Sequence, residues 1–224
     1  MADRSAAPDH VLFDLDGTLI DSIPLILESF RYTLRTHLGA TPSDDVLIDG
    51  IGTPLRAQLY RYCPDTALVE TMFHTYRAHN MEHHDTLLRA FPAVNVAIAR
   101  LAEAGVPMGV VTSKSRDAAL RGLAVTGLAR YFEVVVTLED TARHKPDPEP
   151  VHFGLSRMGG AAARAVYVGD STHDLHAGRA AGARTGAVAW GPFPRADLVA
   201  CRPDWFFETP DEMVAAFTAF TPET

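Results

Sequence analysis

Four short polar segments of this 224-residue sequence carry side chains that can bind a metal ion and phosphate oxygens. Carboxylates are the usual ligands of hard divalent cations such as Mg²⁺, and hydroxyl and ammonium groups suit phosphate oxygens. The segments are Asp14-Leu15-Asp16-Gly17-Thr18, Thr112-Ser113-Lys114, Lys145-Pro146-Asp147-Pro148 and Gly169-Asp170-Ser171-Thr172-His173-Asp174. If the fold brings them together, they can form one site that holds a metal ion and a phosphate group.

The elements that must position these segments are short buried strands. Each polar segment follows an apolar run, directly or after a loop, and the runs have the length of buried strands. They are residues 11–13, 108–111, 134–136 and 165–168, with a fifth at 185–188 and an edge strand expected at 205–207. Stretches of helical period lie between them, at 118–128, 148–158 and 173–181, with a last helix at 211–220. This alternation predicts an α/β fold, with a parallel sheet flanked by helices and its ligands at the carboxyl ends of the strands.

The segment after the first strand has a different pattern. Apolar residues recur there at helical spacing, as in Ile23, Ile26, Leu27, Phe30 and Leu34, and no clear strand is visible. This pattern predicts a helical insert at residues 20–88. The α/β core then consists of residues 1–19 and 89–224.

The composition limits the partners. A net charge of -8 argues against nucleic acid or an anionic membrane as a partner, because both require a basic face. Cys63 and Cys201 stand in no paired motif, so neither a disulfide framework nor a zinc site is expected. No apolar run is long enough to cross a bilayer, and residues 1–10 lack a signal-peptide pattern. The cytoplasm is the expected location, and a monomer and a homodimer remain open.

The four segments, in this order and each at a strand end, resemble the four motifs of the haloacid dehalogenase (HAD) superfamily. The match spans nearly the whole core, and one Asp-x-Asp alone would be weak support. The insert resembles the helical cap of the phosphoglycolate phosphatase-like branch. Asp16 separates this chain from the dehalogenase branch, which lacks a carboxylate at that position and works without metal. The resemblance therefore implies a Rossmann-like core that catalyses phosphoryl transfer.

The resemblance also implies a role for each residue. Asp14 would be the nucleophile that forms an aspartyl-phosphate, and Asp16 would act as general acid and then as general base. Mg²⁺ would be held by Asp14, the backbone carbonyl of Asp16 and Asp170. Phosphate would be bound by the amides of Leu15 and Asp16 and by the side chains of Thr112, Ser113 and Lys145. Asp174 would orient Lys145 or a metal-bound water, although a carboxylate that only stabilises a helix N-terminus is an equal alternative.

The insert should select the substrate, a small phosphorylated compound. Residues 50–56 and 75–85 resemble the cap of the bacterial PpaX-type pyrophosphatases, and the core motifs resemble that group more closely. A second phosphate group needs a cationic partner, for which Arg77 is the first candidate, with Arg56, Asn80 and His84 as further ones. Taken one at a time, each is more simply explained as a solvated residue of a polar face, but as a group the arginines and histidines of an acidic protein indicate a binding site. Inorganic pyrophosphate is the expected substrate, with phosphoglycolate or another small phosphomonoester as the alternative. A phosphosugar mutase of the same fold is the competing class.

Overall fold

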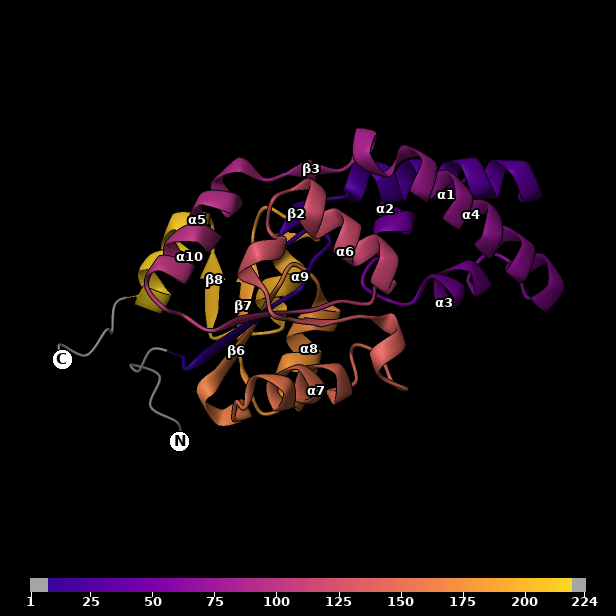
Figure 1. The fold of residues 1–224 in the computed structure, drawn as a ribbon. Helices are drawn as coiled ribbons and strands as arrows, with labels where there is room; N and C mark the ends of the chain where they lie inside the picture. The colour runs from indigo at the N-terminus through magenta and orange to yellow at the C-terminus, as the bar shows by residue number, and fades with distance from the viewer. Residues whose placement is uncertain (1–7, 219–224) are drawn as a thin grey trace, which may run out of the picture.

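The apolar runs form one six-stranded parallel sheet in the computed structural model, which describes residues 8–218 (Figure 1). The strands are β1 (His10–Phe13), β4 (Met108–Val111), β5 (Val134–Val136), β6 (Ala165–Gly169), β7 (Arg184–Val188) and β8 (Trp205–Phe207). Their order across the sheet is β5-β4-β1-β6-β7-β8, and all neighbours pair in parallel. The predicted α/β fold is confirmed, and residues 205–207 form the expected edge strand.

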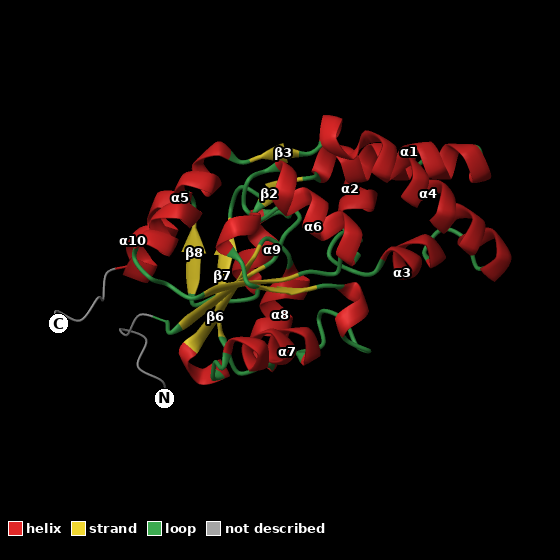
Figure 2. Ribbon diagram, viewed as in Figure 1, coloured by secondary structure: helices red, strands yellow, loops and turns green. Residues whose placement is uncertain are grey.

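Helices cover both faces of the sheet because successive strand side chains point to opposite sides. Val11 and Phe13 of β1 pack in one hydrophobic cluster with residues of helices on one face, whereas Leu12 packs in a second cluster on the other. The first face carries α5 (Pro92–Glu103), α6 (Arg116–Val125) and α10 (Pro210–Thr218). The second carries α7 (Glu149–Met158) and α8 (Thr172–Ala180), as Figure 2 shows. β1 is therefore buried on both sides at the centre of the fold.

The remaining elements of the core are short. They are α9 (Arg195–Ala200) and three 3₁₀ turns, η1 (Ala129–Tyr131), η2 (Leu138–Asp140) and η3 (Ala162–Arg164). The predicted last helix was expected to reach residue 220, but positions 219 and 220 lie outside the described residues. Among residues 8–218, no helix combines the length and the apolar character that crossing a bilayer would require.

Four helices follow the first strand, within the segment predicted as an insert. They are α1 (Ile23–Leu38), α2 (Asp44–Ile48), α3 (Leu55–Tyr60) and α4 (Thr66–Leu87). Apolar side chains of these helices, such as Phe30, Leu34 and Met72, form a hydrophobic cluster separate from those of the sheet. In Figure 1, α1 and α4 extend beyond the sheet on one side. We call residues 20–88 the insert; their division from the core stays a prediction.

A two-stranded antiparallel ribbon lies where the chain enters and leaves the insert. β2 (Ile20–Asp21) pairs with β3 (Arg89–Ala90). The expectation that the insert contains no strand is therefore wrong at its first two residues. A strand of two residues is too short to show the alternation that identifies strands in a sequence.

Candidate active site

Asp14 follows the central strand at the carboxyl edge of the sheet. Its backbone N–H donates to the carbonyl oxygen of Val168 on β6 at 2.8 Å, which extends the pairing of β1 by one residue. The residue is only 4 % exposed. The fold thus places this carboxylate, largely stripped of water, at the edge where the other polar segments converge.

Lys145 bridges two buried carboxylates. Its Nζ donates to Oδ1 of Asp14 at 2.7 Å and to Oδ1 of Asp174 at 2.6 Å. Burial lowers the pKa of the ammonium group, but the two carboxylates outweigh this effect, and the pKa of Lys145 lies above its ordinary value. Lys145 is therefore charged at neutral pH and fixed beside Asp14.

Asp174 makes hydrogen bonds that fit both of the alternatives stated from the sequence, and its role stays a prediction. It caps α8, since its Oδ2 accepts from the N–H and the Oγ of Ser171 at 3.2 and 2.6 Å, and Ser171 accepts in return from its N–H. Its Oδ1 accepts from Lys145 and from the hydroxyl of Tyr167, the latter at 3.1 Å. Tyr167 is a partner that the sequence did not identify, because it lies inside a buried strand with no polar neighbour.

Asp170 follows β6 and has one carboxylate oxygen without a partner. Its Oδ1 accepts from the hydroxyl of Thr18 at 2.7 Å. Its Oδ2 is buried and has no hydrogen-bond partner among the described residues. Burial, together with the neighbouring Asp174 and Asp14 carboxylates, raises the pKa of Asp170 well above its ordinary value. Such a group is costly to bury in its ionised form unless a cation compensates it.

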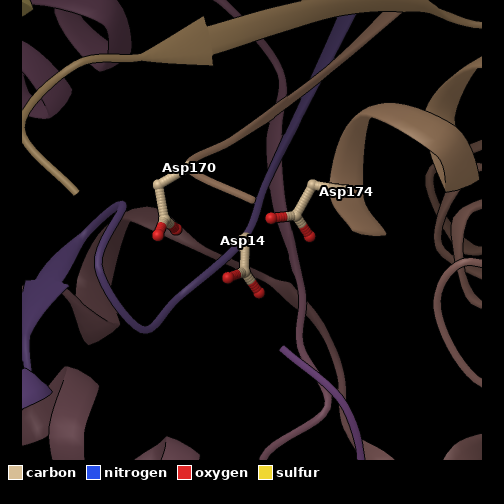
Figure 3. Close-up of side chains that lie close together, drawn as sticks. All are labelled: Asp14, Asp170 and Asp174. Atoms are coloured by element: carbon tan, nitrogen blue, oxygen red, sulfur yellow. The ribbon is translucent and has the colours of Figure 1, made fainter. Parts of the chain in front are cut away.

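Three carboxylates lie close enough to share a metal ion. Oxygen atoms of Asp14, Asp170 and Asp174 all lie within 4.8 Å of one another, and Figure 3 shows the three side chains converging, Asp14 from the end of β1, Asp170 from the end of β6 and Asp174 from α8. Both oxygens of Asp174 already accept hydrogen bonds from Lys145, Tyr167 and Ser171. Asp14 and Asp170 are thus the pair whose carboxylate oxygens remain available to bind a metal ion, and oxygen ligands of this kind fit a hard divalent cation.

The electrostatic environment of Asp14 is balanced between opposing groups. Burial and the nearby Asp174 carboxylate raise the pKa of Asp14 to about 7, although Lys145 acts in the opposite direction. A divalent cation between Asp14 and Asp170 would favour the ionised carboxylate. Binding of a metal ion there would therefore be coupled to the ionisation of Asp14.

Asp16 reaches from the same loop toward a cavity. Its Oδ1 accepts from the hydroxyl of Ser22 at 2.5 Å and from Nζ of Lys114 at 2.7 Å. Neither Ser22 nor Lys114 was given a role from the sequence. The available signal for Lys114 was its position in the second polar segment, two residues after Thr112.

Thr112 and Ser113, which follow β4, have different surroundings. Thr112 lines the cavity, and its Oγ1 accepts from the N–H of Lys114 at 3.1 Å. Ser113 also lines the cavity, but its hydroxyl donates to the backbone oxygen of Gly52 in the insert at 2.7 Å. Ser113 thus joins the core to the insert.

Leu15 is fully buried between the two aspartates. Its carbonyl oxygen accepts from the N–H groups of Leu19 and Ile20 at 2.9 and 3.0 Å, which closes the turn after β1. Gly17 has a φ of 82° in this turn, a left-handed conformation that glycine adopts without strain. Phosphate binding by the amides of Leu15 and Asp16 stays a prediction.

A cavity of about 250 Å³ lies between the core and the insert. Most of the predicted site residues line it. From the core these are Asp14, Asp16, Thr112, Ser113 and Lys145, joined by Lys114 and Ser115, and from the insert Arg56, Arg77 and Asn80, joined by Gly52, Gln58 and Tyr76. The cavity is smaller than typical sites for drug-sized ligands, so it suits a small molecule.

The two arginines of the insert differ in their partners. Arg77 donates from Nη1 to the hydroxyl of Ser115 in the core and forms no salt bridge within residues 8–218. Arg56 donates to both carboxylate oxygens of Glu70 at 2.7 and 3.0 Å, and its guanidinium lies 3.6 Å from the ring centroid of Phe73. Arg77 therefore retains a free positive charge for a ligand, whereas that of Arg56 is neutralised.

The other two candidates of the insert are separated by the structure. Asn80 lines the cavity and is buried, with Nδ2 donating to the hydroxyl of Ser29 at 3.3 Å. His84 is fully buried outside the cavity lining, where its Nδ1 lies 2.9 Å from Oδ1 of Asp85 and its ring lies near Gly122 of α6. The structure thus brings Asn80 to the site and leaves His84 at the contact between α4 and α6.

Sequence comparison defines the class of protein. The family model of haloacid dehalogenase-like hydrolases matches residues 11–188. The chain therefore belongs to the haloacid dehalogenase-like hydrolase family, as its four motifs predict, and it is a hydrolase by that membership.

Two relatives and one solved structure show which members of the family this chain is similar to. The chain is 40 % identical to pyrophosphatase PpaX of Bacillus pumilus over 205 residues, which cover 92 % of this chain and 94 % of that protein. It is also 40 % identical to pyrophosphatase PpaX of Bacillus velezensis, over 91 % of this chain and 94 % of that protein. Its fold matches a haloacid dehalogenase-like family hydrolase from Streptococcus pneumoniae with a TM-score of 0.82, at 24 % identity over 95 % of this chain and 99 % of the other. The predicted resemblance to this group is confirmed.

Proposed function

We propose that this protein is a Mg²⁺-dependent phosphohydrolase that forms an aspartyl-phosphate on Asp14, with inorganic pyrophosphate as its substrate. The observation that carries the proposal is the convergence of Asp14, Asp16, Thr112 and Lys145 on a cavity of about 250 Å³. The unpaired charge of Arg77 reaches the same cavity from the insert. This set contains a nucleophile, an acid–base group and positive charge for two phosphate groups.

In the first step, a carboxylate oxygen of Asp14 attacks phosphorus. Lys145 donates to Oδ1 of Asp14, and no described residue donates a hydrogen bond to Oδ2, which leaves Oδ2 for the attack. Lys145 and Thr112 bind oxygens of the transferring phosphoryl group, where fixed donors contribute most because they need no reorganisation. Asp16 donates its proton to the leaving oxygen as the bond to phosphorus breaks.

In the second step, water hydrolyses the aspartyl-phosphate. Asp16 is now ionised and takes a proton from water, whose oxygen attacks phosphorus and releases Asp14. Ser22 and Lys114 both donate to Oδ1 of Asp16, so its other oxygen can serve the reacting groups. One residue thus handles the proton in both steps.

The metal ligands would be Asp14, Asp170 and the backbone carbonyl of Asp16. The unpartnered Oδ2 of Asp170 supports this assignment, because it is buried among other carboxylates. When bound, Mg²⁺ would offset the repulsion between the Asp14 carboxylate and an anionic phosphate. Asp174 is left to orient Lys145.

We further propose that residues 20–88 act as a cap over the cavity and select the substrate. The free charge of Arg77 suits a second phosphate group, and both PpaX relatives are named pyrophosphatases. A guanidinium also binds a carboxylate in a bidentate manner, so phosphoglycolate is the alternative substrate that the same residue would accept.

A phosphate-release assay on the purified full chain tests the proposal. The panel contains pyrophosphate, phosphoglycolate and neutral sugar phosphates, each with Mg²⁺, with Ca²⁺ and with a chelator. We expect the fastest turnover of pyrophosphate with Mg²⁺, poor turnover with Ca²⁺ and none with chelator. Equal rates for pyrophosphate and sugar phosphates would rule out the pyrophosphatase assignment.

Asp14→Asn tests the mechanism separately from the substrate. The amide has nearly the same size as the carboxylate but is a poor nucleophile, so we expect turnover to disappear while the fold is retained. Circular dichroism and thermal unfolding check the fold. Residual turnover close to that of the wild type would show that Asp14 is not the nucleophile.

The mutase alternative is tested on the wild type. Transfer of phosphate to a second position of the substrate, without phosphate release, would indicate a mutase.

A further inference from the structure

Lys114 is a cation of the cavity whose hydrogen-bonding capacity is only partly used. Its Nζ donates to Oδ1 of Asp16 at 2.7 Å, and its side chain is only 9 % exposed. An ammonium group has three N–H donors, so two remain after this contact. Lys114 also lines the cavity, where these donors can reach a ligand.

The other cations that line the cavity are distributed differently. Lys145 is held between Asp14 and Asp174, on the nucleophile side. Arg56 is paired with Glu70. Lys114 and Arg77 are left, and both line the cavity, with Arg77 donating to the hydroxyl of Ser115, the residue that follows Lys114.

The position of the leaving group follows from the position of its proton donor. Asp16 must lie within hydrogen-bond reach of the oxygen that it protonates. Nζ of Lys114 donates to Oδ1 of Asp16 at 2.7 Å, so a group protonated by the other oxygen of the same carboxylate leaves on the side of the cavity where Lys114 lies. A charged leaving group would thus meet Lys114 from the core and Arg77 from the insert.

We infer that Lys114 and Arg77 form a subsite for an anionic leaving group, with Lys114 as a specificity-determining residue. The inference rests on the proposed function. For pyrophosphate, the bond from Asp14 to phosphorus forms while the bond from phosphorus to the bridging oxygen breaks. The bridging oxygen takes its electron pair and the Asp16 proton, and the departing phosphate pairs with Lys114 and Arg77. Water then restores Asp14, with its proton passing to Asp16.

The subsite predicts a preference that depends on the leaving group. Pyrophosphate and phosphoglycolate leave as groups that carry an ionised phosphate or carboxylate, which can pair with Lys114. The p-nitrophenyl group of p-nitrophenyl phosphate carries no such ionised group while bound. Removing the charge of Lys114 should therefore affect the first two substrates far more than the third.

The test compares kcat/KM of wild type and Lys114→Met on these three substrates with Mg²⁺. We expect losses of about 10- to 100-fold for the anionic leaving groups, the size expected for one charge-assisted contact, and a loss at least tenfold smaller for the aryl phosphate. Lys114→Arg should retain most of the activity. Arg116→Met is the matched control, since Arg116 pairs with Asp140 outside the cavity lining, and it should change none of the three values.

The outcomes separate this inference from the proposed function. An equal loss for all three substrates would mean that Lys114 acts only by positioning Asp16, and the subsite would be disproved; no loss would disprove it as well. Failure of the wild type to hydrolyse pyrophosphate would refute the proposed substrate alone.

Titration calorimetry with imidodiphosphate, which is not cleaved, then tests the subsite without turnover. We expect binding at least tenfold weaker in Lys114→Met, and unchanged binding would overturn the inference. Lys114→Gln replaces Lys114→Met if the latter does not fold.

Discussion

The hydroxyl of Ser113, at the end of β4, donates a hydrogen bond of 2.7 Å to the backbone carbonyl oxygen of Gly52 in the insert. This contact joins a core motif to the insert, and both residues line the cavity. Gly52 has a φ of 94°, and a Cβ atom at this position would lie 3.3 Å from Oγ of Ser171. The loop that carries Gly52 therefore approaches two of the core segments closely.

Ser113→Ala distinguishes a contact between core and insert from a phosphate contact. If the hydroxyl only holds Gly52, its loss removes one neutral hydrogen bond, so we expect KM to rise less than about fivefold with kcat unchanged. A hydroxyl that binds the transferring phosphoryl group would instead lower kcat/KM by about tenfold or more. Steady-state kinetics with pyrophosphate decide between the two, and a large loss in kcat would contradict the structural role.

Arg77→Met and Arg56→Met form a matched pair for the insert. Both arginines line the cavity, but only Arg56 is neutralised by a carboxylate, that of Glu70. We expect Arg77→Met to lower kcat/KM for pyrophosphate by about 10- to 100-fold, because a charged contact to substrate is lost. Arg56→Met should change it less than about threefold, since exposed ion pairs contribute little. A larger loss of kcat/KM in Arg56→Met than in Arg77→Met would show that Arg56 exchanges its contact with Glu70 for one with the substrate.

The strands of the core could be predicted because each is a continuous apolar run that ends in a polar segment. Parallel strands bring their carboxyl ends to one edge, so Asp14, Thr112 and Asp170 were expected to meet although they are far apart in the chain. The ribbon of β2 and β3 could not be predicted, since two residues carry no periodicity. Its pairing depends on the fold as a whole.

The residues of the insert were harder to assign, as α4 shows. Arg77, Asn80 and His84 have spacings that place them on one face of this helix. Seven residues of helix extend about 10 Å, however, so His84 lies well beyond Arg77 along the axis. The His84 side chain therefore lies outside the cavity lining and packs beside α6. The free charge of Arg77 and the pairing of Arg56 depend on Ser115 and Glu70, which no local pattern connects to them.

Asp174→Asn should weaken both the fold and the reaction. Asp174 is fully buried and accepts from Lys145, so its neutralisation leaves a buried charge with one partner fewer. We expect a loss of about 3–5 kcal/mol in the free energy of unfolding and a decrease of about 10- to 100-fold in kcat. Asp140→Asn is the control, because Asp140 also closes a capping box, with Thr137, but has no contact with Lys145. It should cost about 1 kcal/mol. If denaturant unfolding showed equal losses of unfolding free energy for Asp174→Asn and Asp140→Asn, Asp174 would contribute to stability only as a helix cap.

The stability of the metal-free protein should fall as pH rises, because of Asp14. Its pKa is raised from 3.8 to about 7, first by burial and then by Asp174. Between these values the folded state binds more protons than the unfolded state, so the free energy of unfolding decreases with pH. His173 acts in the opposite sense, since burial lowers its pKa and its protonation disfavours the folded state. The contribution of Asp14 must therefore be measured as the difference in Tm between wild type and a variant that lacks the Asp14 carboxylate.

Thermal unfolding of wild type and Asp14→Asn from pH 5 to pH 8, with chelator and with Mg²⁺, provides that difference. With chelator, we expect the Tm of Asp14→Asn to gain on that of the wild type as pH rises, because the variant lacks the ionising group. Mg²⁺ should stabilise the wild type more at pH 8 than at pH 6, since it replaces the protons that Asp14 and Asp170 lose. The variant should show a smaller Mg²⁺ effect at both values. A Tm difference between wild type and variant that stays constant from pH 5 to pH 8 with chelator would contradict this prediction, because it would show that Asp14 is ionised throughout this range in the folded state.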